Sequence, residues 1–222
     1  MGSIKPENWK YGEVIGIGFV YLVLILNTFL FKDSLVAVLS AFFGVTYTML
    51  AGKGNPNCYL FGIAGSGLYS WLALTNGLWG NLCLYLLYYI PMQIIGFYKW
   101  NQHLKKDSHE IVKSKLDKRE WMILVIIIAV LSILCIKILY ITQDKSPVID
   151  GLTTILSIAG MYLTVKRALE QWFIWIIVNG FTAIMWVNIL LNGERVYSTV
   201  VMWLVYFILA IYFCREWKNE VV

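Results

Sequence analysis

Long apolar stretches alternate with short polar interruptions along nearly the whole chain. A transmembrane helix needs about 20 mostly apolar residues, so each stretch predicts a membrane-spanning helix, although several are near the short limit. The interruption at Lys53–Asn57 (KGNPN) consists of good turn formers and divides the second helix from the third. The eight predicted spans run roughly over 12–31, 35–52, 58–75, 81–98, 121–141, 148–165, 172–191 and 196–214.

Composition supports a membrane protein and excludes other classes. The 222 residues are 59% hydrophobic and 14% charged, whereas soluble domains average about 45–50% apolar and about 25% charged. Four prolines, glycines without a period and four cysteines exclude disorder, collagen and a disulfide scaffold. The sequence therefore predicts an all-α polytopic membrane protein with almost no extramembrane domain.

Lysine and arginine gather at one set of polar interruptions. With eight spans, the termini and the even-numbered connections share one side, where 14 of the 18 Lys and Arg residues fall, seven of them from Lys99 to Arg119. Cytoplasmic loops carry such an excess, so both termini and the 99–120 loop are predicted to be cytoplasmic. The net charge of +5 is then a topology signal, and no nucleic-acid partner is expected.

A weak internal repeat appears at a spacing of 117 residues. The repeat predicts two parallel three-helix bundles joined by one inverting helix, a plan used by transporters. An old duplication that left only packing behind is the alternative. The matches are Leu39-Ser40 with Leu156-Ser157, Leu87 with Leu204, Tyr89 with Tyr206, Ile94 with Ile211, Trp100 with Trp217, and, at a spacing of 116, Asn76-Gly77 with Asn192-Gly193.

This plan predicts the division of the chain. An extra N-terminal helix comes first, and a basic cytoplasmic loop, interpreted as a solvated connection, separates the first bundle from the linker helix. The predicted parts are 1–34 (extra helix), 35–100 (first bundle), 101–120 (loop), 121–147 (linker helix) and 148–222 (second bundle).

Ionisable residues are nearly absent from the predicted spans. Lys137 lies near a helix end, from which it can snorkel to the interface, and no carboxylate is centred in a span. The sequence contains neither a phosphate-binding loop nor a Cys/His cluster. It therefore predicts no enzyme activity, no cofactor and no metal, and favours passive diffusion of an uncharged or weakly charged solute.

The strongest candidate site opens the seventh span. Trp172, Trp175 and Asn179 are spaced at i, i+3 and i+7, which places them on one helical face. Two aromatic faces followed by an amide suit a flat heterocycle with hydroxyl or amide groups. Trp172 also fits an interfacial aromatic belt, and Asn179 also fits an interhelical packing bond.

Other polar residues within the spans are weaker candidates for the same site. Gln93 lies beside Pro91, which frees a backbone carbonyl. Tyr89 and Tyr206 occupy equivalent repeat positions, which fits either a shared pocket or repeated core packing. The remaining two candidates, Thr46 and Asn188, are better explained by packing bonds.

At these residues the chain resembles the PnuC family of bacterial vitamin transporters, whose best-known members carry nicotinamide riboside. The resemblance spans about residues 35–217. Its motifs are WxxWxxxN at Trp172, Trp175 and Asn179, Phe61-Gly62 after the Asn55–Asn57 turn, and Gln93 followed by Gly96-Phe97-Tyr98-Lys99-Trp100. It implies a 3+1+3 core related to the SWEET sugar transporters, a central site, a bacterial cytoplasmic membrane, and facilitated diffusion of a solute that a cytoplasmic kinase then traps.

Together these observations predict a facilitator for a nucleoside-like vitamin, with nicotinamide riboside as the leading substrate. Trp172 and Trp175 would stack on the ring, while Asn179 and Gln93 would bond the amide or ribose. Thiamine, riboflavin and deoxynucleosides, which related families carry, stay open as substrates. A non-transporting membrane scaffold or accessory subunit is the alternative from another class. The oligomeric state, a homo-oligomer included, is also open.

Overall fold

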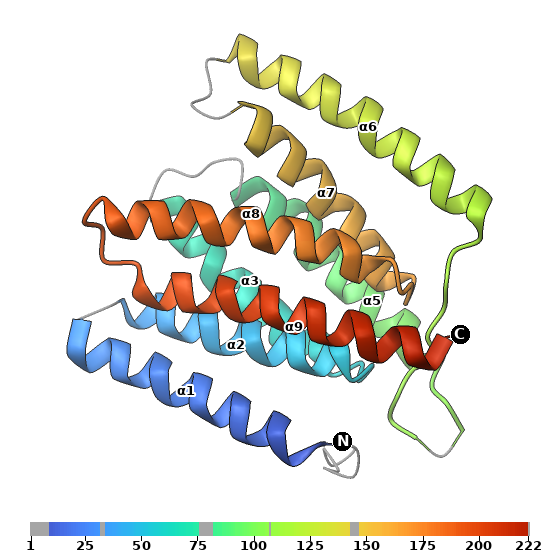
Figure 1. Ribbon diagram of the computed structural model, residues 1–222, viewed down its shortest axis with the longest axis horizontal. Helices are drawn as coiled ribbons and strands as arrows, with labels where there is room; N and C mark the ends of the chain where they lie inside the picture. The colour runs from blue at the N-terminus through green and yellow to red at the C-terminus, as the bar shows by residue number, and fades with distance from the viewer. Residues whose placement is uncertain (1–8, 32–33, 76–81, 107, 143–146, 222) are drawn as a thin grey trace.

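A computed structural model describes residues 9–31, 34–75, 82–106, 108–142 and 147–221, and most of these residues are helical. The predicted spans overlap helical segments, and their bounds agree to within about three residues except at the C-terminal end, where the last helix continues seven residues past the predicted 214. Six of the described helices are long and apolar enough to cross a membrane. The elements are α1 (Tyr11–Phe31), α2 (Leu35–Gly52), α3 (Cys58–Thr75), the π-helical segment η1 (Leu84–Tyr89), α5 (Ile90–Asn101), α6 (Lys118–Ile141), α7 (Pro147–Val165), α8 (Gln171–Leu191) and α9 (Tyr197–Val221) (Figure 1).

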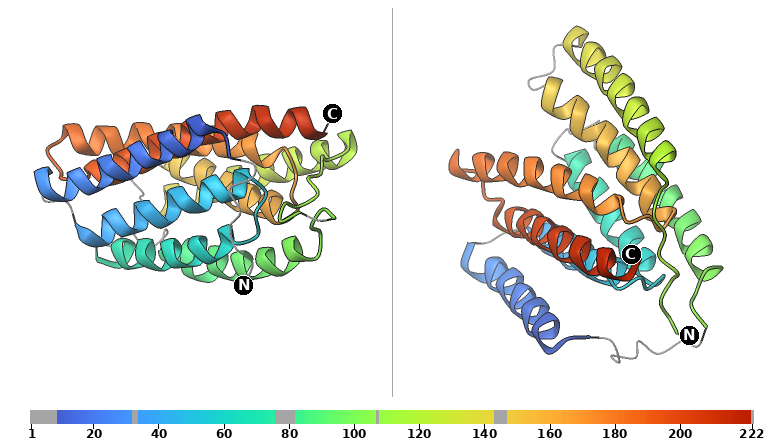
Figure 2. Two further views of the ribbon diagram at one scale, coloured as in Figure 1. Left: turned by 90° about the horizontal axis from the view of Figure 1, so that it is seen from below. Right: turned by 45° about the vertical axis from the view of Figure 1, so that its right-hand side comes forward.

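The helices form two groups that meet face to face. We call α2, α3, η1 and α5 the first bundle, and α7, α8 and α9 the second bundle. The bundles meet where α2 packs against α9 and α5 packs against α7, so the first helix of each contacts the last helix of the other. Outside this pair, α1 contacts α2 and α9, while α6 packs along α7 at the outer edge (Figures 1 and 2).

The last helix of the first bundle begins with an irregular turn. The π-helical segment Leu84–Tyr89 runs directly into α5, whose second residue is Pro91. Proline has no N–H to donate to the preceding turn, and a π-bulge is one way in which a helix absorbs that loss. The wider turn places Tyr85 and Tyr89 together, with ring centroids 4.7 Å apart.

Two buried tryptophans connect the bundles at one end of the molecule. Nε1 of Trp100 in α5 donates to the carbonyl of Thr164 in α7 at 2.9 Å. Nε1 of Trp217 in α9 donates to the carbonyl of Gly52 in α2 at 2.7 Å. Carbonyls in the last turn of a helix often lack a partner within the helix. Trp217 provides a donor for the buried carbonyl of Gly52, whereas the carbonyl of Thr164 accepts from Arg167 N as well as from Trp100. We call this pair the clamp tryptophans.

The helices that receive these bonds end in the same way. Gly54 follows α2 with a φ of 68°, and Arg167 follows α7 with a φ of 63°. In both cases the next amide reaches back to a carbonyl of the last turn: Asn55 N donates to Leu50 O, and Ala168 N donates to Leu163 O, each at 3.0 Å. These bonds form the usual left-handed helix terminus, which turns the chain sharply at the same end of both bundles.

The segment between α5 and α6 is not the solvated connection that the sequence predicted. Ile111 is fully buried, and its amide donates to the carbonyl of Gly54 at 2.9 Å. Three residues later, Ser114 N donates to Arg167 O, and Leu169 N donates to Ser114 O, both at 2.9 Å. The segment therefore binds the turn after α2 and the turn after α7. The prediction was wrong because charge in the sequence did not reveal that the backbone here pairs with both bundles.

A buried lysine holds the same segment against α9. The Lys113 side chain is 5% exposed, forms an ion pair with Glu220, and lies 5.1 Å from the centroid of the Trp217 ring. Burial lowers the pKa of Lys113, and the carboxylate of Glu220 opposes that shift. Partial burial makes this pair stronger than an exposed one, so it contributes to seating the segment.

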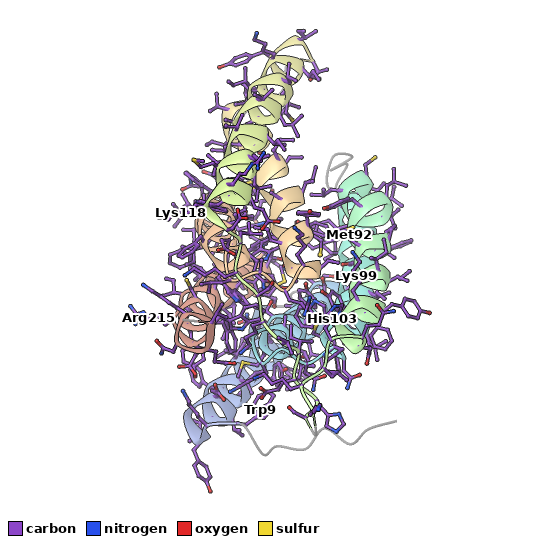
Figure 3. All side chains as sticks on the ribbon, turned by 90° about the vertical axis from the view of Figure 1, so that its right-hand side faces the viewer. Trp9, Met92, Lys99, His103, Lys118 and Arg215 are labelled. Atoms are coloured by element: carbon purple, nitrogen blue, oxygen red, sulfur yellow. The ribbon has the colours of Figure 1, made fainter. Side chains whose placement is uncertain are left out.

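The described ends of the chain and the α5–α6 segment all lie at the end of the molecule that carries the clamp tryptophans (Figure 1). Figure 3 looks onto this end and labels Lys99, Lys118 and Arg215, three of the cations that the topology prediction places on one side. The Asn76-Gly77 turn of the predicted repeat lies outside the described residues, as do Lys5, Lys32 and Lys145, which are among the 18 Lys and Arg residues that the topology prediction counts.

Replacing a clamp tryptophan by phenylalanine removes the N–H but keeps an aromatic ring. Trp217→Phe leaves the carbonyl of Gly52 buried without its donor, so we expect the free energy of unfolding to fall by about 1–3 kcal/mol. The midpoint of thermal unfolding of the detergent-solubilised protein measures this loss. Trp71→Phe, at a position that is 58% exposed, is the control. Equal midpoints for the two variants would contradict the assigned role.

Candidate functional site

A cavity of about 100 Å³ lies between the two bundles. Every helix of both bundles contributes to its wall, and all the described residues that line it are uncharged. Aromatic rings dominate, with amides and hydroxyls between them. The aromatic and polar residues of the wall are Ser40, Tyr47, Thr48, Ser66, Tyr69, Tyr85, Tyr89, Gln93, Thr164, Gln171, Trp172, Trp175, Asn179, Trp203 and Tyr206.

The cavity brings together most of the residues that the sequence singled out. Six of the eight line its wall, namely Trp172, Trp175, Asn179, Gln93, Tyr89 and Tyr206. Thr46 lies elsewhere, sharing a 2.7 Å hydrogen bond with the hydroxyl of Tyr21 and donating to Phe42 O. Asn188 is on α8 but outside the lining residues. Thr46 therefore makes a packing bond between helices, which is the explanation that the sequence analysis favoured for this residue.

One face of α8 forms the aromatic side of the cavity. Asn179 is 5% exposed and Trp172 is 2% exposed, so neither is an interfacial belt residue here. The Trp172 ring packs on Phe213 and Trp217, with centroids 5.5 and 5.6 Å away. Its Nε1 is buried without a hydrogen-bond partner among the described residues. A buried donor without a partner at a cavity wall is available to a ligand.

The sequence analysis missed a fourth residue of the same face. Gln171 lies four residues before Trp175 and eight before Asn179, which is the spacing of one helical face. The Gln171 side chain is buried, and its Nε2 donates to the carbonyl of Ala168 at 3.0 Å. The periodicity could have identified it, but its position at the start of the helix made it look like part of the connecting turn.

Trp175 is held in place by α7. Its Nε1 donates to Oγ1 of Thr164 at 3.1 Å. A Cβ added to Gly160 would come within 3.0 Å of the Trp175 ring, so glycine provides the space in which the indole lies. The ring orientation therefore depends on two α7 residues that neither sequence motif nor hydrophobic pattern identified.

Gln93 provides the polar group opposite the tryptophans. It is 3% exposed, and its Nε2 donates to Oγ of Ser66 at 3.0 Å. Oε1 of Gln93 has no hydrogen-bond partner among the described residues. A Cβ added to Gly62 would lie 3.1 Å from Cδ of Gln93 and 2.8 Å from the Tyr47 ring. The amide is thus packed tightly, with one acceptor left for a ligand.

Tyrosines from three helices close the remaining wall. Tyr69 and Tyr85 have ring centroids 4.5 Å apart, and Tyr89 lies next to Tyr85. Tyr206 extends from α9 toward Gly44 of α2, where only a glycine leaves room for its hydroxyl. Within the described part of the chain, no group of three or more His, Cys, Asp or Glu side chains is placed to hold a metal.

A second, larger hollow of about 430 Å³ lies between α1, α2 and α9. Its wall is mostly aliphatic, with charge confined to one end, where Glu13 pairs with Lys53 at 2.7 Å and accepts a hydrogen bond from Tyr212 at 2.7 Å. It lies on the outer side of the α2–α9 contact, against the peripheral helix α1, and the described residues that line it come from these three helices and the residue before α1. The central cavity, with its unsatisfied amide and indole groups, is therefore the candidate functional site.

A multi-helix membrane bundle with a central cavity of aromatic and amide groups is typical of a membrane transporter. Residues 34–219 match the family described as nicotinamide mononucleotide transporter. The chain belongs to this family, whose members are transporters and not enzymes, and the resemblance to PnuC proteins is confirmed.

Two relatives and one solved structure give the extent of the similarity. A nicotinamide riboside transporter PnuC from Neisseria mucosa is 30% identical over 234 residues, covering 99% of this chain and 89% of the relative. A protein of the same name from Haemophilus influenzae is 28% identical over 182 residues, covering 81% and 80%. The crystal structure of the vitamin B3 transporter PnuC matches with a TM-score of 0.85 and 29% identity, covering 96% of this chain and 93% of that chain. The prediction of an all-helical membrane fold is confirmed by this match.

Two glycines of α3 test how tightly the cavity wall is packed. Gly62→Ala places a methyl group against Gln93 and Tyr47, so we expect overpacking to lower the free energy of unfolding by about 1–3 kcal/mol. A Cβ added to Gly67, five residues later, meets nothing within 4 Å. Gly67→Ala is thus a matched control that should gain up to about 1 kcal/mol from helix propensity. Thermal unfolding in detergent compares the two, and equal stabilities would show that the wall yields at Gly62.

Proposed function

We propose that this protein carries nicotinamide riboside by facilitated diffusion across the bacterial cytoplasmic membrane. The central observation is the chemistry of the cavity, which combines stacked aromatic faces with one free amide acceptor and no formal charge. Nicotinamide riboside is a flat pyridinium cation that bears a carboxamide and a ribose. Each of these three parts has a counterpart in the cavity wall.

The aromatic groups suit the ring, and the amides suit its substituents. Trp172 and Trp175 would stack on the pyridinium, whose positive charge adds a cation–π attraction. Oε1 of Gln93 lacks a donor and would accept a hydrogen bond from the carboxamide NH₂. Asn179 lies one to two turns along α8 from the tryptophans and would bond the ribose, with Tyr89 and Tyr206 nearby at the wall.

The absence of charge along the described wall favours the riboside over the mononucleotide. A phosphate group taken out of water needs arginine, lysine or a helix N-terminus to replace its hydration. None of the described lining residues is cationic. The mononucleotide would leave its phosphate unpaired in the cavity, at a cost of several kcal/mol.

A passive cycle agrees with the same wall. No carboxylate lies among the described lining residues, so proton or sodium coupling has no obvious group through which to act. The cavity of about 100 Å³ is smaller than the about 300–1,000 Å³ typical of ligand sites. Binding a nucleoside therefore requires the bundles to separate, which supports a rocking motion of two three-helix bundles about the site.

The rest of the predicted arrangement completes the proposal. Eight spans in a 3+1+3 core preceded by an extra helix, as in SWEET transporters, would place both termini and the α5–α6 segment in the cytoplasm. The reciprocal contacts of α2 with α9 and of α5 with α7 support two related bundles. A cytoplasmic kinase would trap the solute by adding a phosphate. The uncharged cavity would not bind the phosphorylated product, so the product would not be carried back out.

A non-transporting scaffold is less consistent with the structure. It requires a closed core in which Gln93 and Asn179 serve only helix packing. Instead, the core contains a cavity in which Oε1 of Gln93 and Nε1 of Trp172 have no partner among the described residues. Thiamine, riboflavin and deoxynucleosides also contain a flat ring but lack the pyridine carboxamide. Their affinities, compared with that of nicotinamide riboside, therefore distinguish between the candidate substrates.

The decisive experiment measures binding to the purified protein by calorimetry. We expect nicotinamide riboside to bind, nicotinamide mononucleotide to bind at least about 10-fold more weakly, and thiamine, riboflavin and deoxynucleosides to bind more weakly still. Uptake into proteoliposomes should be saturable and unaffected by a proton or sodium gradient. Tight binding of the mononucleotide, or a preference for another vitamin, would overturn the substrate assignment.

Trp175→Ala tests the site itself. Removing the indole deletes the stacking and cation–π contacts, so we expect affinity for nicotinamide riboside to fall about 10-fold or more. Trp71→Ala removes an exposed tryptophan of the first bundle and should leave affinity unchanged. If both variants bind like the wild type, the cavity is not the binding site.

A further inference from the structure

We infer that Thr164 is a positioning residue that fixes the Trp175 ring for the substrate through its hydroxyl. This inference rests on the proposed function, because it concerns how the same cavity is built. Thr164 does not need to touch the ligand for this role. Its effect passes through Trp175.

The hydroxyl of Thr164 makes two hydrogen bonds, one as donor and one as acceptor. The residue is 1% exposed, and its Oγ1 donates to the carbonyl of Gly160 at 2.8 Å while accepting Nε1 of Trp175 at 3.1 Å. Donating to Gly160 directs the hydroxyl proton away from the indole and leaves a lone pair for its N–H. The hydrogen bond therefore sets the direction of the indole, and Gly160 provides the surface on which the ring lies.

The other tryptophan of the site is held differently. Trp172 is packed between the rings of Phe213 and Trp217, and its Nε1 has no partner among the described residues. Trp175 is only partly buried, whereas Trp172 is fully buried, so packing alone constrains Trp175 less. A polar contact is the means by which the structure orients the more accessible ring.

The backbone of Thr164 connects the site to the opposite bundle. Its carbonyl accepts Nε1 of Trp100, one of the clamp tryptophans, at 2.9 Å. One residue of α7 thus bonds a ring of the site through its side chain and a helix of the first bundle through its backbone. Movement of α5 relative to α7 would act on the residue that orients Trp175.

The experiment compares three threonine variants by affinity for nicotinamide riboside and by thermal unfolding. T164V keeps the shape but removes the acceptor, and we expect affinity to fall about 5- to 10-fold. T164S restores the hydroxyl and should recover affinity to within about 2-fold. T182V is the matched control, because Thr182 of α8 makes the same bond to the carbonyl four residues back and lies outside the cavity wall.

A double-mutant cycle separates positioning from general packing. W175F keeps a ring but lacks the N–H, so T164V should cost little further affinity in the W175F background. If T164V does not purify as folded protein, T164A takes its place in the cycle. Additive losses, or a T164S variant as weak as T164V, would overturn the positioning role. Failure of the wild type to bind nicotinamide riboside would instead overturn the proposed function, and this inference with it.

Discussion

The structure depends on two indole N–H groups that cross the boundary between the bundles. Trp100 and Trp217 each donate to a carbonyl near the end of the opposite bundle's first helix. In lipid, an unbonded carbonyl at a helix end costs several kcal/mol, so the bond from Trp217 allows the end of α2 to be buried. The bond from Trp100 is a second one to a carbonyl that Arg167 N also reaches, and it ties α5 to α7. The same contacts hold the bundles close together at one end. There the α5–α6 segment bonds both the turn after α2 and the turn after α7.

The two bundles share a scaffold but not a site. Thr48 and Thr164, 116 residues apart, both bond the carbonyl four residues back in the first helix of their bundle. Thr164 also receives the indole of Trp175, whereas at Tyr59, 116 residues before Trp175, the hydroxyl has no partner among the described residues. In the proposed repeat, similar helices would provide the frame, and their different side chains would give the cavity distinct faces for an asymmetric solute.

Periodicity could predict part of the site and could not predict the rest. Trp172, Trp175 and Asn179 share a face of one helix, and spacing within one helix is a local property. Gln93 was a candidate because it is a polar residue within a span, close to Pro91, which frees a backbone carbonyl. Ser66, which orients Gln93, and Thr164, which orients Trp175, lie on other helices. The periodicity of residues along one helix does not indicate which residues of another helix those residues contact.

By itself, the sequence determined the helical membrane architecture, the approximate extent of most helices and the family, because apolar length, turn residues and the WxxWxxxN motif are properties of contiguous residues. Only the tertiary structure decided which candidates meet in the cavity, that Thr46 bonds Tyr21 instead, and that the basic segment after α5 pairs with both bundles. The physical reason is that burial and hydrogen bonding between helices depend on how the helices pack. The charge or hydrophobicity along one segment does not specify that packing.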